Sequence, residues 1–398
     1  MYWESLFNHR ALRLQPSIIQ EMMAFASRPG VISFAAGQPS EDLYPTEAIA
    51  EGLKFSLSEP SVLAYPNTAG DTSLREWISV WMAKEGLSSG EKGAENILLT
   101  TGSQQGLNIL SQLFLQEGDG VIVENPSYPE AMLTFAKEGA RFFPVSLDEE
   151  GPIPEELETL LSQEKIRFFY TIPTFQNPSG RSTSAARKKI ILEVLKRHNV
   201  FVVEDDPYRQ LWFDEEPACT YLSMAEKENH VVYLGSFSKI IAPGLRCGWM
   251  VLPPEVMEKA VYLRLTLELG VSSLLQKTVL YVVSQEKFLH HMRRIRAVYA
   301  QRRHAMASAV EEYLNPLGFK SVVPKGGFFF WGELHGVNGV DLSYLAAAKH
   351  KVAVIPGEIF FSKPEEGRFW MRLSFAKVGE EKIIDGVKRL SCAIQEFI

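Results

Sequence analysis

The chain of 398 residues contains little cysteine and no long hydrophobic run. Its three cysteines, Cys219, Cys247 and Cys392, are far apart and form neither a CxxC pair nor an even disulfide framework, which favours a reducing compartment. No segment is apolar over the roughly 18 residues that a membrane helix needs, and the first residues lack the basic and apolar regions of a signal peptide. The sequence therefore predicts a cytoplasmic protein without a membrane segment.

The chain also lacks an excess of positive charge and a metal-binding motif. Its formal net charge of -7 gives no general attraction to nucleic acid or to an anionic membrane surface. The arginines at positions 293–303 lie in a long helical pattern, where such a run usually forms one solvated face. The eight histidines show no HExxH or comparable spacing. We therefore expect neither a nucleic-acid partner nor a metal.

The arrangement of apolar residues indicates an α/β fold. Between residues 97 and 252 short, almost wholly apolar runs alternate with longer amphipathic stretches, which is typical of buried parallel strands and the helices that cover them. The predicted strands are 97–100, 120–123, 167–172, 200–204, 231–234 and 249–252. The pattern changes after Pro253, where a helix-rich stretch leads to an α+β region from about Asn315. At this length we expect more than one domain.

The unusual polar motifs follow the predicted strands, and ligands of open parallel sheets bind beyond the carboxyl ends of the strands. Gly102, Ser103 and Gln104 stand between a strand and a helix, where backbone N–H groups can receive a phosphate. An ordinary helix cap uses the same residues. Tyr128 and Asn177 follow the next two strands, and packing or a simple turn would also explain them.

Three acids, Glu204, Asp205 and Asp206, stand in a row at the end of a predicted buried strand, with Tyr208 just after them. Adjacent carboxylates repel one another and resist burial, so a counter-charge is expected nearby. A protonated pyridine nitrogen would supply that charge. Helix capping or exposure to water is the alternative.

The segment 236–249 is the most specific feature of the sequence. Ser236 and Ser238 flank Lys239, and Arg246 follows beyond a Pro-Gly turn. Two hydroxyls and a guanidinium can bind a phosphate, and the amine between them would then lie near a cofactor aldehyde. A lone lysine is usually a surface charge, but this spacing at a strand end favours a cofactor site.

These motifs resemble those of the fold-type I, class I/II pyridoxal 5'-phosphate (PLP) aminotransferases, especially the α-aminoadipate and kynurenine aminotransferases, over nearly the whole chain. The main landmarks are YPNTAGDTSLR (65–75), TFQNPSG (174–180), VEDDPYRQL (203–211), GSFSKIIAPGLRCGW (235–249) and MRLSFA (371–376). The resemblance implies a large PLP-binding domain with a mostly parallel seven-stranded sheet between helices (46–285), a small α+β domain (286–398), and an N-terminal arm and helix that pack with it (1–45).

The resemblance also implies a role for each matching residue. Lys239 would hold PLP through a Schiff base and move the substrate proton, and Asp205 would pair with the ring nitrogen. The other ring contacts would be Tyr208 and Asn177 at the 3'-oxygen and Tyr128 on the ring face. The phosphate would be bound by Gly102, Ser103, Gln104, Ser236, Ser238 and Arg246, and by Tyr65 from the partner subunit of a homodimer. Arg372 would hold the substrate α-carboxylate, assisted by Asn177 and the backbone at Gly37.

The implied reaction is a ping-pong transfer of the amino group from an L-amino acid to a 2-oxo acid such as 2-oxoglutarate, with pyridoxamine 5'-phosphate as the intermediate form of the cofactor. In aminoadipate-type members an arginine on the N-terminal helix binds the distal carboxylate, and here Gln20 takes that place. The missing charge favours neutral, aliphatic or aromatic donors, and an aminoadipate-like donor stays open because Arg13 could turn inward and substitute.

Two alternatives stay open at this point. The same fold and cofactor also serve racemases, β-lyases and decarboxylases. They serve MocR-type transcription regulators as well, in which a basic winged-helix domain precedes an effector-binding domain. The aminotransferase pattern begins here by Ser33, which disfavours the regulator.

Overall fold

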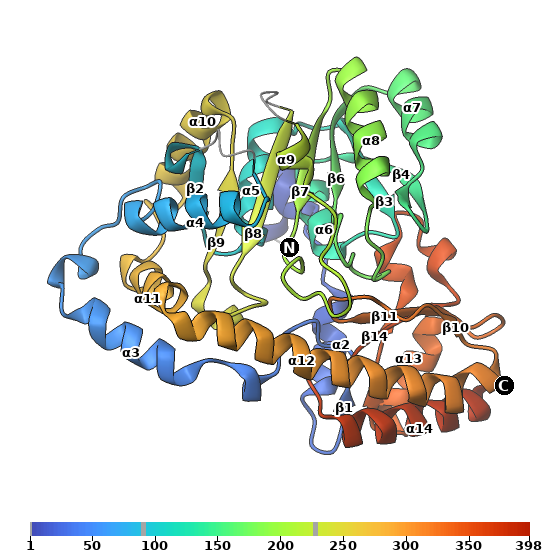
Figure 1. Cartoon of the computed structure of the whole chain (residues 1–398). Helices are drawn as coiled ribbons and strands as arrows, with labels where there is room; N and C mark the ends of the chain where they lie inside the picture. Colours follow the sequence, from blue (N-terminus) through green and yellow to red (C-terminus); the bar gives the residue numbers. More distant parts are fainter. Residues whose placement is uncertain (1, 89–92, 226–229) are drawn as a thin grey trace.

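The computed structural model describes residues 2–88, 93–225 and 230–398 (Figure 1). Within them the largest element is an eight-stranded sheet with the order β2-β9-β8-β7-β6-β3-β4-β5. Its strands are β2 (Ile97–Thr100), β3 (Gly120–Asn125), β4 (Arg141–Asp148), β5 (Gly151–Pro152), β6 (Ile166–Thr171), β7 (Phe201–Asp205), β8 (Val231–Ser236) and β9 (Gly248–Val251). The pairs from β8 to β4 are parallel, whereas β9 is antiparallel to both of its neighbours.

All six predicted strands are present in this sheet, with ends that differ by at most two residues. The strand that the pattern did not predict is β4, because Pro144 and several half-exposed residues interrupt its apolar character. With β4 the expected seven strands are present, and the two-residue β5 extends the sheet to eight.

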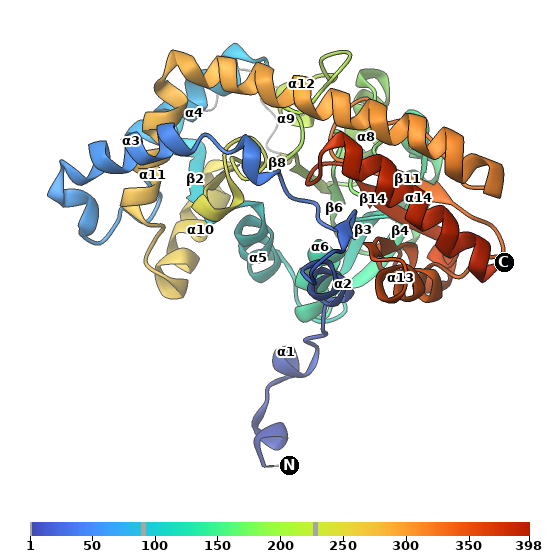
Figure 2. The same ribbon diagram turned by 90° about the horizontal axis from the view of Figure 1, so that it is seen from below.

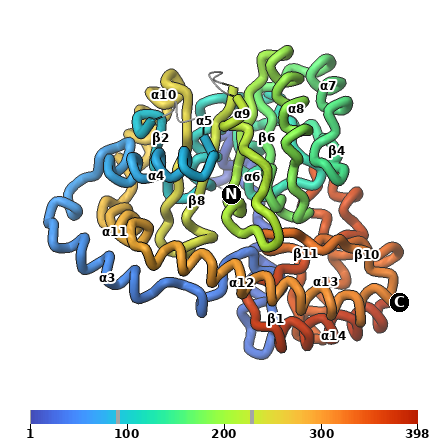
Figure 3. Tube along the Cα trace, in the orientation of Figure 1, coloured from blue at the N-terminus to red at the C-terminus, as the bar shows by residue number. Residues whose placement is uncertain are grey.

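Helices connect these strands and cover the sheet (Figure 1). The helices are α1 (His9–Leu12), α2 (Ile18–Ala26), α3 (Thr46–Leu57), α4 (Thr72–Lys84), α5 (Ser103–Phe114), α6 (Pro129–Lys137), α7 (Pro154–Gln163), α8 (Ala185–Arg197), α9 (Tyr221–Met224), α10 (Pro254–Leu267), α11 (Ser273–Ser284), α12 (Glu286–Ala309), α13 (Gly339–Ala348) and α14 (Glu380–Phe397). The trace in Figure 3 shows α3 beside α11, two segments far apart in the sequence.

Helix α5 illustrates how closely these helices approach the sheet. A Cβ atom added at Gly106 would lie 2.9 Å from the Leu234 side chain of β8 and 3.3 Å from Met250 of β9. The helix therefore needs glycine at the contact with these two strands. Close packing at this point fixes the amino end of α5 beside the carboxyl end of β8.

A smaller antiparallel sheet with the order β10-β11-β14-β13 lies in the C-terminal part of the chain. Its strands are β10 (Lys320–Ser321), β11 (Phe329–Glu333), β13 (Ile355–Pro356) and β14 (Trp370–Ser374). A parallel pair of β1 (Ile32–Ser33) and β12 (Val352–Ala353) joins the N-terminal segment to this region. The expected domain boundaries at 45 and 285 remain predictions.

Helix α12 extends from the part of the chain that holds the large sheet to the part that holds the small sheet (Figure 1). Its arginines do not form one solvated face. Arg296 donates to the Gln210 carbonyl at 2.7 Å, and Arg303 pairs with Asp214 at 2.8 Å. Arg302 is only 5% exposed. The sequence interpretation of this run was wrong because carbonyl and carboxylate acceptors that are distant in the sequence lie against the helix.

In the part of the chain that the structure describes, no helix is both long and apolar enough to cross a membrane. The N-terminal segment that carries α1 projects away from the rest of the chain (Figure 2). Trp3 and Phe7 on this segment are more than half exposed.

Candidate active site

A pocket with about 650 Å³ of empty space lies beyond the carboxyl ends of the central strands. Eleven of the residues singled out in the sequence line it: Gly102, Ser103, Gln104, Tyr128, Asn177, Asp205, Tyr208, Ser236, Ser238, Lys239 and Arg246. They come from the carboxyl ends of β7 and β8, from the amino end of α5, and from the loops after β2, β3, β6, β7 and β8. The fold thus brings together side chains that are up to 144 positions apart, from Gly102 to Arg246.

Lys239 supplies an amine in this pocket. Its Nζ donates to the carbonyl oxygen of Gly37 at 2.7 Å and lies 5.6 Å from the centre of the Tyr208 ring. Burial, with the nearby charge of Arg372, lowers the pKa of Lys239 to about 8, although Asp205 opposes this shift. With this pKa about a tenth of the amine is neutral at pH 7, and the neutral form is the state required of a nucleophile.

Asp205 points into the same pocket from the end of β7. The Tyr170 hydroxyl donates to Asp205 Oδ2 at 3.0 Å. The Ser103 hydroxyl is close enough to lower the pKa of Asp205 slightly, yet neither Ser103 Oγ nor Asp205 Oδ1 has a partner of good hydrogen-bond geometry. Burial raises the pKa of Asp205 to about 7. The charge of Lys239 opposes this rise only in part, so the carboxylate can still be stabilised by a further cation in the pocket.

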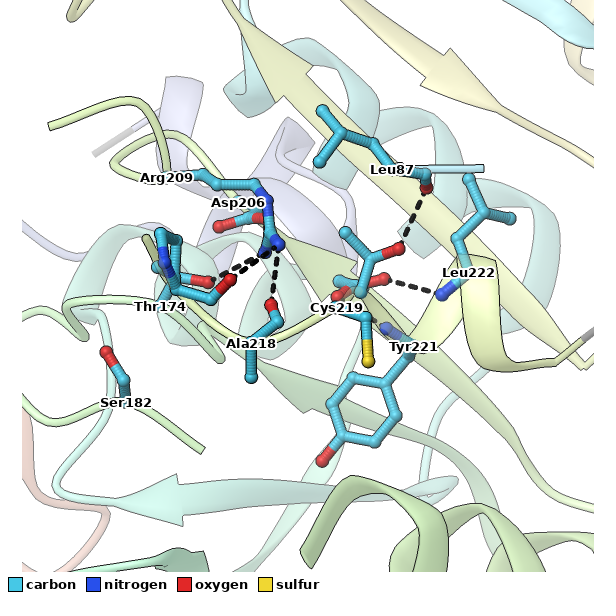
Figure 4. A network of polar contacts seen from close by, with 12 residues as sticks. Leu87, Thr174, Ser182, Asp206, Arg209, Ala218, Cys219, Tyr221 and Leu222 are labelled. Atoms are coloured by element: carbon cyan, nitrogen blue, oxygen red, sulfur yellow. Dashed lines mark hydrogen bonds and ion pairs between the residues drawn. The ribbon is translucent and has the colours of Figure 1, made fainter. Parts of the chain in front are cut away.

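The neighbouring acids face the other side of the sheet, because successive side chains of a strand alternate. Glu204 accepts from the backbone N–H groups of Tyr221 and Leu222, both at 2.9 Å. Asp206 pairs with Arg209 at 3.3 Å, in the network of Figure 4. On this side Arg209 supplies the counter-charge for Asp206, and backbone N–H groups stabilise Glu204.

The loops after β2 and β8 form a recess with donors on both sides. Gly102 has a φ of 88°, and a Cβ atom there would lie 3.0 Å from Arg246 Nη2. Because α5 begins at Ser103, the first N–H groups of this helix have no carbonyl partner within it. Ser236 and Ser238 line the same pocket. Such a recess can bind a phosphate.

The Gln104 side chain is engaged elsewhere. Its amide donates to Thr134 Oγ1 on α6 at 2.7 Å. The backbone N–H is therefore the group of Gln104 that is left for a ligand in the recess.

Arg372, on β14, is a buried cation next to the pocket. It is 2% exposed and donates to Asn177 Oδ1 at 2.7 Å and to the Ala35 carbonyl at 2.8 Å. Its guanidinium lies 4.3 Å from the centre of the Phe329 ring and 5.1 Å from that of Phe360. Burial lowers the pKa of Arg372 to about 10. No carboxylate among the described residues lies within ion-pair distance of it, so the site suits an anion from outside.

Gly37 lies close to both Lys239 and Arg372, and a Cβ atom there would lie 3.0 Å from the Phe329 ring. Neither Gly37 nor Arg372 lines the pocket itself, and three other predicted residues do not line it either. Tyr65 is 88% exposed, and Gln20 is exposed on α2. Arg13 pairs with Glu117. The roles of these three residues stay predictions.

The structure shows three residues that do not line the pocket but act on residues beside it, and the sequence interpretation gave them no role. Tyr170 is hidden in an apolar strand, and nothing in the pattern distinguishes it. Glu130 is a largely buried acid whose pKa burial raises, and the charges of Arg372 and Lys239 oppose this rise. Glu124 follows a buried strand, as the acids after β7 do, so the same signal could have identified it.

A family model described as aminotransferase class I and II matches residues 29–390. The chain belongs to this family. Its cofactor is PLP and its reaction is the transfer of an amino group.

The relatives narrow the subgroup. Aromatic-amino-acid aminotransferase 1 of Thermococcus litoralis is 35% identical over 99% of this chain and 95% of its own length. The α-aminoadipate aminotransferase of Thermus thermophilus, complexed with N-(5'-phosphopyridoxyl)-L-leucine, is 36% identical, with a TM-score of 0.91 over 99% of this chain and 98% of that one. Kynurenine aminotransferase of Pyrococcus horikoshii is 35% identical, with a TM-score of 0.93 over the same shares. These relatives favour amino-group transfer over the lyase, racemase and regulator alternatives.

Proposed function

We propose that this aminotransferase takes the amino group from a neutral, aromatic or aminoadipate-like L-amino acid and passes it to a 2-oxo acid, with 2-oxoglutarate as the acceptor, in the cytoplasm. The observation that carries the proposal is Arg372, a buried cation without a carboxylate partner beside the Lys239 amine. Both substrates of such a transfer carry the α-carboxylate that this cation would bind. The names of the aminoadipate, aromatic and kynurenine relatives support the choice of donors.

The pocket fits PLP through two features of this chain. The unpartnered Asp205 Oδ1 would hold the protonated ring nitrogen, and the recess between Gly102 and Arg246 would hold the phosphate. Tyr208 and Asn177 would bond the 3'-oxygen, and Tyr128 would stack on the ring. The other phosphate donors would be Ser103, Gln104, Ser236 and Ser238. When bound, PLP supplies an electron sink for the bonds at the substrate Cα.

The protein residues would then direct which bond breaks. Lys239, with a pKa of about 8, would remove the proton from Cα and return it one carbon away, as general base and then general acid. A bidentate grip by Arg372 would keep the α-carboxylate in place, so that the proton leaves and the carboxylate does not. Asn177 would orient this guanidinium, as its 2.7 Å contact with Arg372 suggests.

We further propose a homodimer with shared active sites. Tyr65 is 88% exposed in the single chain, and it would bind the phosphate of the partner subunit. The projecting N-terminal segment of Figure 2, with its exposed Trp3 and Phe7, would pack on the partner. Gln20 on α2 would set side-chain preference. Arg13 would compete for that role only if it left Glu117.

The experiment that tests the proposal is Lys239→Ala with the exposed Lys189→Ala as control. We expect loss of turnover by at least about 10²-fold, the lower range for a positioned acid–base group, and no covalent cofactor on the chain after borohydride reduction, detected by mass spectrometry. Lys189→Ala should behave as the unmodified enzyme does. Turnover retained by Lys239→Ala would refute the proposal. Release of ammonia without use of a 2-oxo acid would indicate lyase chemistry instead.

A further inference from the structure

Glu124 is a buried acid that the proposed reaction does not use. It lies at the end of β3, is 2% exposed, and accepts three hydrogen bonds from the chain that follows β6. Thr171 Oγ1 donates at 2.5 Å, the Ile172 N–H at 3.1 Å and Gln176 Nε2 at 3.0 Å. A buried carboxylate is costly unless such donors stabilise it, so this arrangement needs an explanation.

Gln176 extends the contact to a second loop. It is 2% exposed, and its Nε2 also donates to the Pro126 carbonyl at 2.7 Å. Its Oε1 accepts from the Ser179 backbone N–H at 2.9 Å and from Ser179 Oγ at 2.6 Å. One side chain therefore joins the loop after β3 to the loop after β6, and Glu124 holds that side chain in place.

These two loops carry residues of the active site. Tyr128 follows Pro126, and Asn177 follows Gln176 directly. Asn177 Oδ1 in turn accepts the 2.7 Å hydrogen bond from Arg372. A shift of Gln176 would therefore move the acceptor that orients the proposed carboxylate-binding cation.

We infer that Glu124 is a positioning residue for substrate binding, which acts through Gln176 to hold the Tyr128 loop against the Asn177 loop and so to orient Arg372. This inference rests on the proposed role of Arg372. Glu124 itself touches neither substrate nor cofactor. Its loss should weaken binding of the amino donor more than it slows the chemical step.

Substitutions at Glu124 and at Gln176 test whether their contact positions Arg372. Gln176→Glu places two carboxylates face to face in a buried site, and we expect the KM for the amino donor to rise at least about tenfold, with kcat less affected. Glu124→Gln alone should stay within about threefold of the original KM, because the new amide can still accept from Ile172 and Gln176 while the Thr171 hydroxyl turns to accept. Glu124→Met keeps a similar volume but accepts none of the three hydrogen bonds, so it should raise the KM as Gln176→Glu does.

Glu204→Gln is the matched control, since Glu204 is also a buried acid at a strand end but bonds on the other side of the sheet. It should lower the melting temperature and leave the KM unchanged. If Gln176→Glu does not fold, Gln176→Met can be used instead. It has a similar volume, removes the hydrogen bonds to Glu124 and to the Pro126 carbonyl, and should raise the KM in the same way.

Two results would overturn the inference: an unchanged KM in the folded Gln176 and Glu124→Met variants, or a rise of the KM by the same factor in Glu204→Gln. Failure of the proposed function would look different. The unmodified enzyme would then show no transamination, or Arg372→Lys would leave the KM unchanged.

Discussion

At the end of β7, the acids on the two sides of the sheet differ in their hydrogen-bond and ion-pair partners. On the side away from the pocket, Glu204 and Asp206 have backbone donors or an arginine as partners (Figure 4). On the pocket side, Asp205 accepts from the Tyr170 hydroxyl and has no ion pair among the described residues, although Oδ1 lacks a partner in Asp205 and Asp206 alike. The arginines differ in the same way. Arg302 pairs with Asp42 at 3.0 Å, whereas Arg372 contacts only neutral acceptors among the described residues.

This difference in ion pairing distinguishes residues that stabilise the fold from residues that surround the pocket. A buried polar group without a partner costs free energy, so a folded chain keeps few of them. Where one acid and one cation both remain unpaired around a single pocket, a ligand with the opposite charges completes them. Around this pocket the acid and the cation without ion pairs, Asp205 and Arg372, are therefore the groups that we propose for the cofactor and substrate contacts.

The strongest test of this contrast compares Asp205→Asn with Asp206→Asn. Asp205→Asn should lower kcat by about 100-fold or more, because an amide cannot hold a ring cation and a buried charge pair is worth about 3–5 kcal/mol. Asp206→Asn should lower the free energy of unfolding and leave kcat within about threefold. The measurements are steady-state kinetics and denaturant unfolding. Equal losses of kcat in both variants would abolish the distinction between the two sides.

Arg372→Lys should have the next largest effect. Lysine keeps the charge but loses the two-pronged geometry, so we expect the KM for the amino donor to rise by about 2 kcal/mol, or roughly 30-fold. Initial rates over a range of donor concentrations measure it. Arg302→Lys serves as the control with a paired cation and should change the melting temperature rather than the KM. If Arg302→Lys raised the KM and Arg372→Lys changed only the melting temperature, Arg302 and not Arg372 would be the substrate-binding arginine.

Thr220→Ala probes the scaffold alone. Thr220 accepts from the Ser223 N–H at 2.9 Å as the N-cap of α9 and donates to the Leu87 carbonyl at 2.8 Å. Its loss should cost about 1 kcal/mol of unfolding free energy, without a change in kcat or KM. Thermal unfolding and a single kinetic assay check this result, and a kinetic defect would show that the network behind the sheet reaches the pocket.

The smallest expected effect concerns pH. Because burial raises the pKa of Asp205 from 3.8 to about 7, the folded chain without cofactor holds a proton that the unfolded chain has released between these values. Its stability therefore falls as the pH rises through this window. A ring cation beside Asp205 lowers that pKa, so the cofactor should raise the melting temperature by about 2–4 °C more at about pH 8 than at about pH 5. Asp205→Asn should remove this difference, and an identical gain at both pH values in the unmodified protein would contradict it.

The sequence was sufficient to predict the central strands and the pocket residues that follow them. Buried parallel strands have continuous apolar runs, and the polar residues after each run, such as Asp205 and Lys239, fell at the same edge of the sheet. The roles of these residues stay predictions.

Features that depend on distant contacts could not be predicted. Strand β4 contains Pro144 and lies next to the short β5, so its pattern is weak. Tyr170 matters only because β6 lies beside β7, which no local pattern records. The partners of Arg302 and Arg303 on α12 are likewise set by packing over more than 80 positions of sequence.

The alternation of β7 also limits how this segment can change. Glu204 pairs in register with Thr171 on one neighbouring strand and with Tyr233 on the other. Losing or gaining a single residue within 201–205 would shift the frame of the strand by one and turn Asp205 toward the scaffold. Substitutions in this strand should therefore preserve activity far more often than the insertion or deletion of one residue.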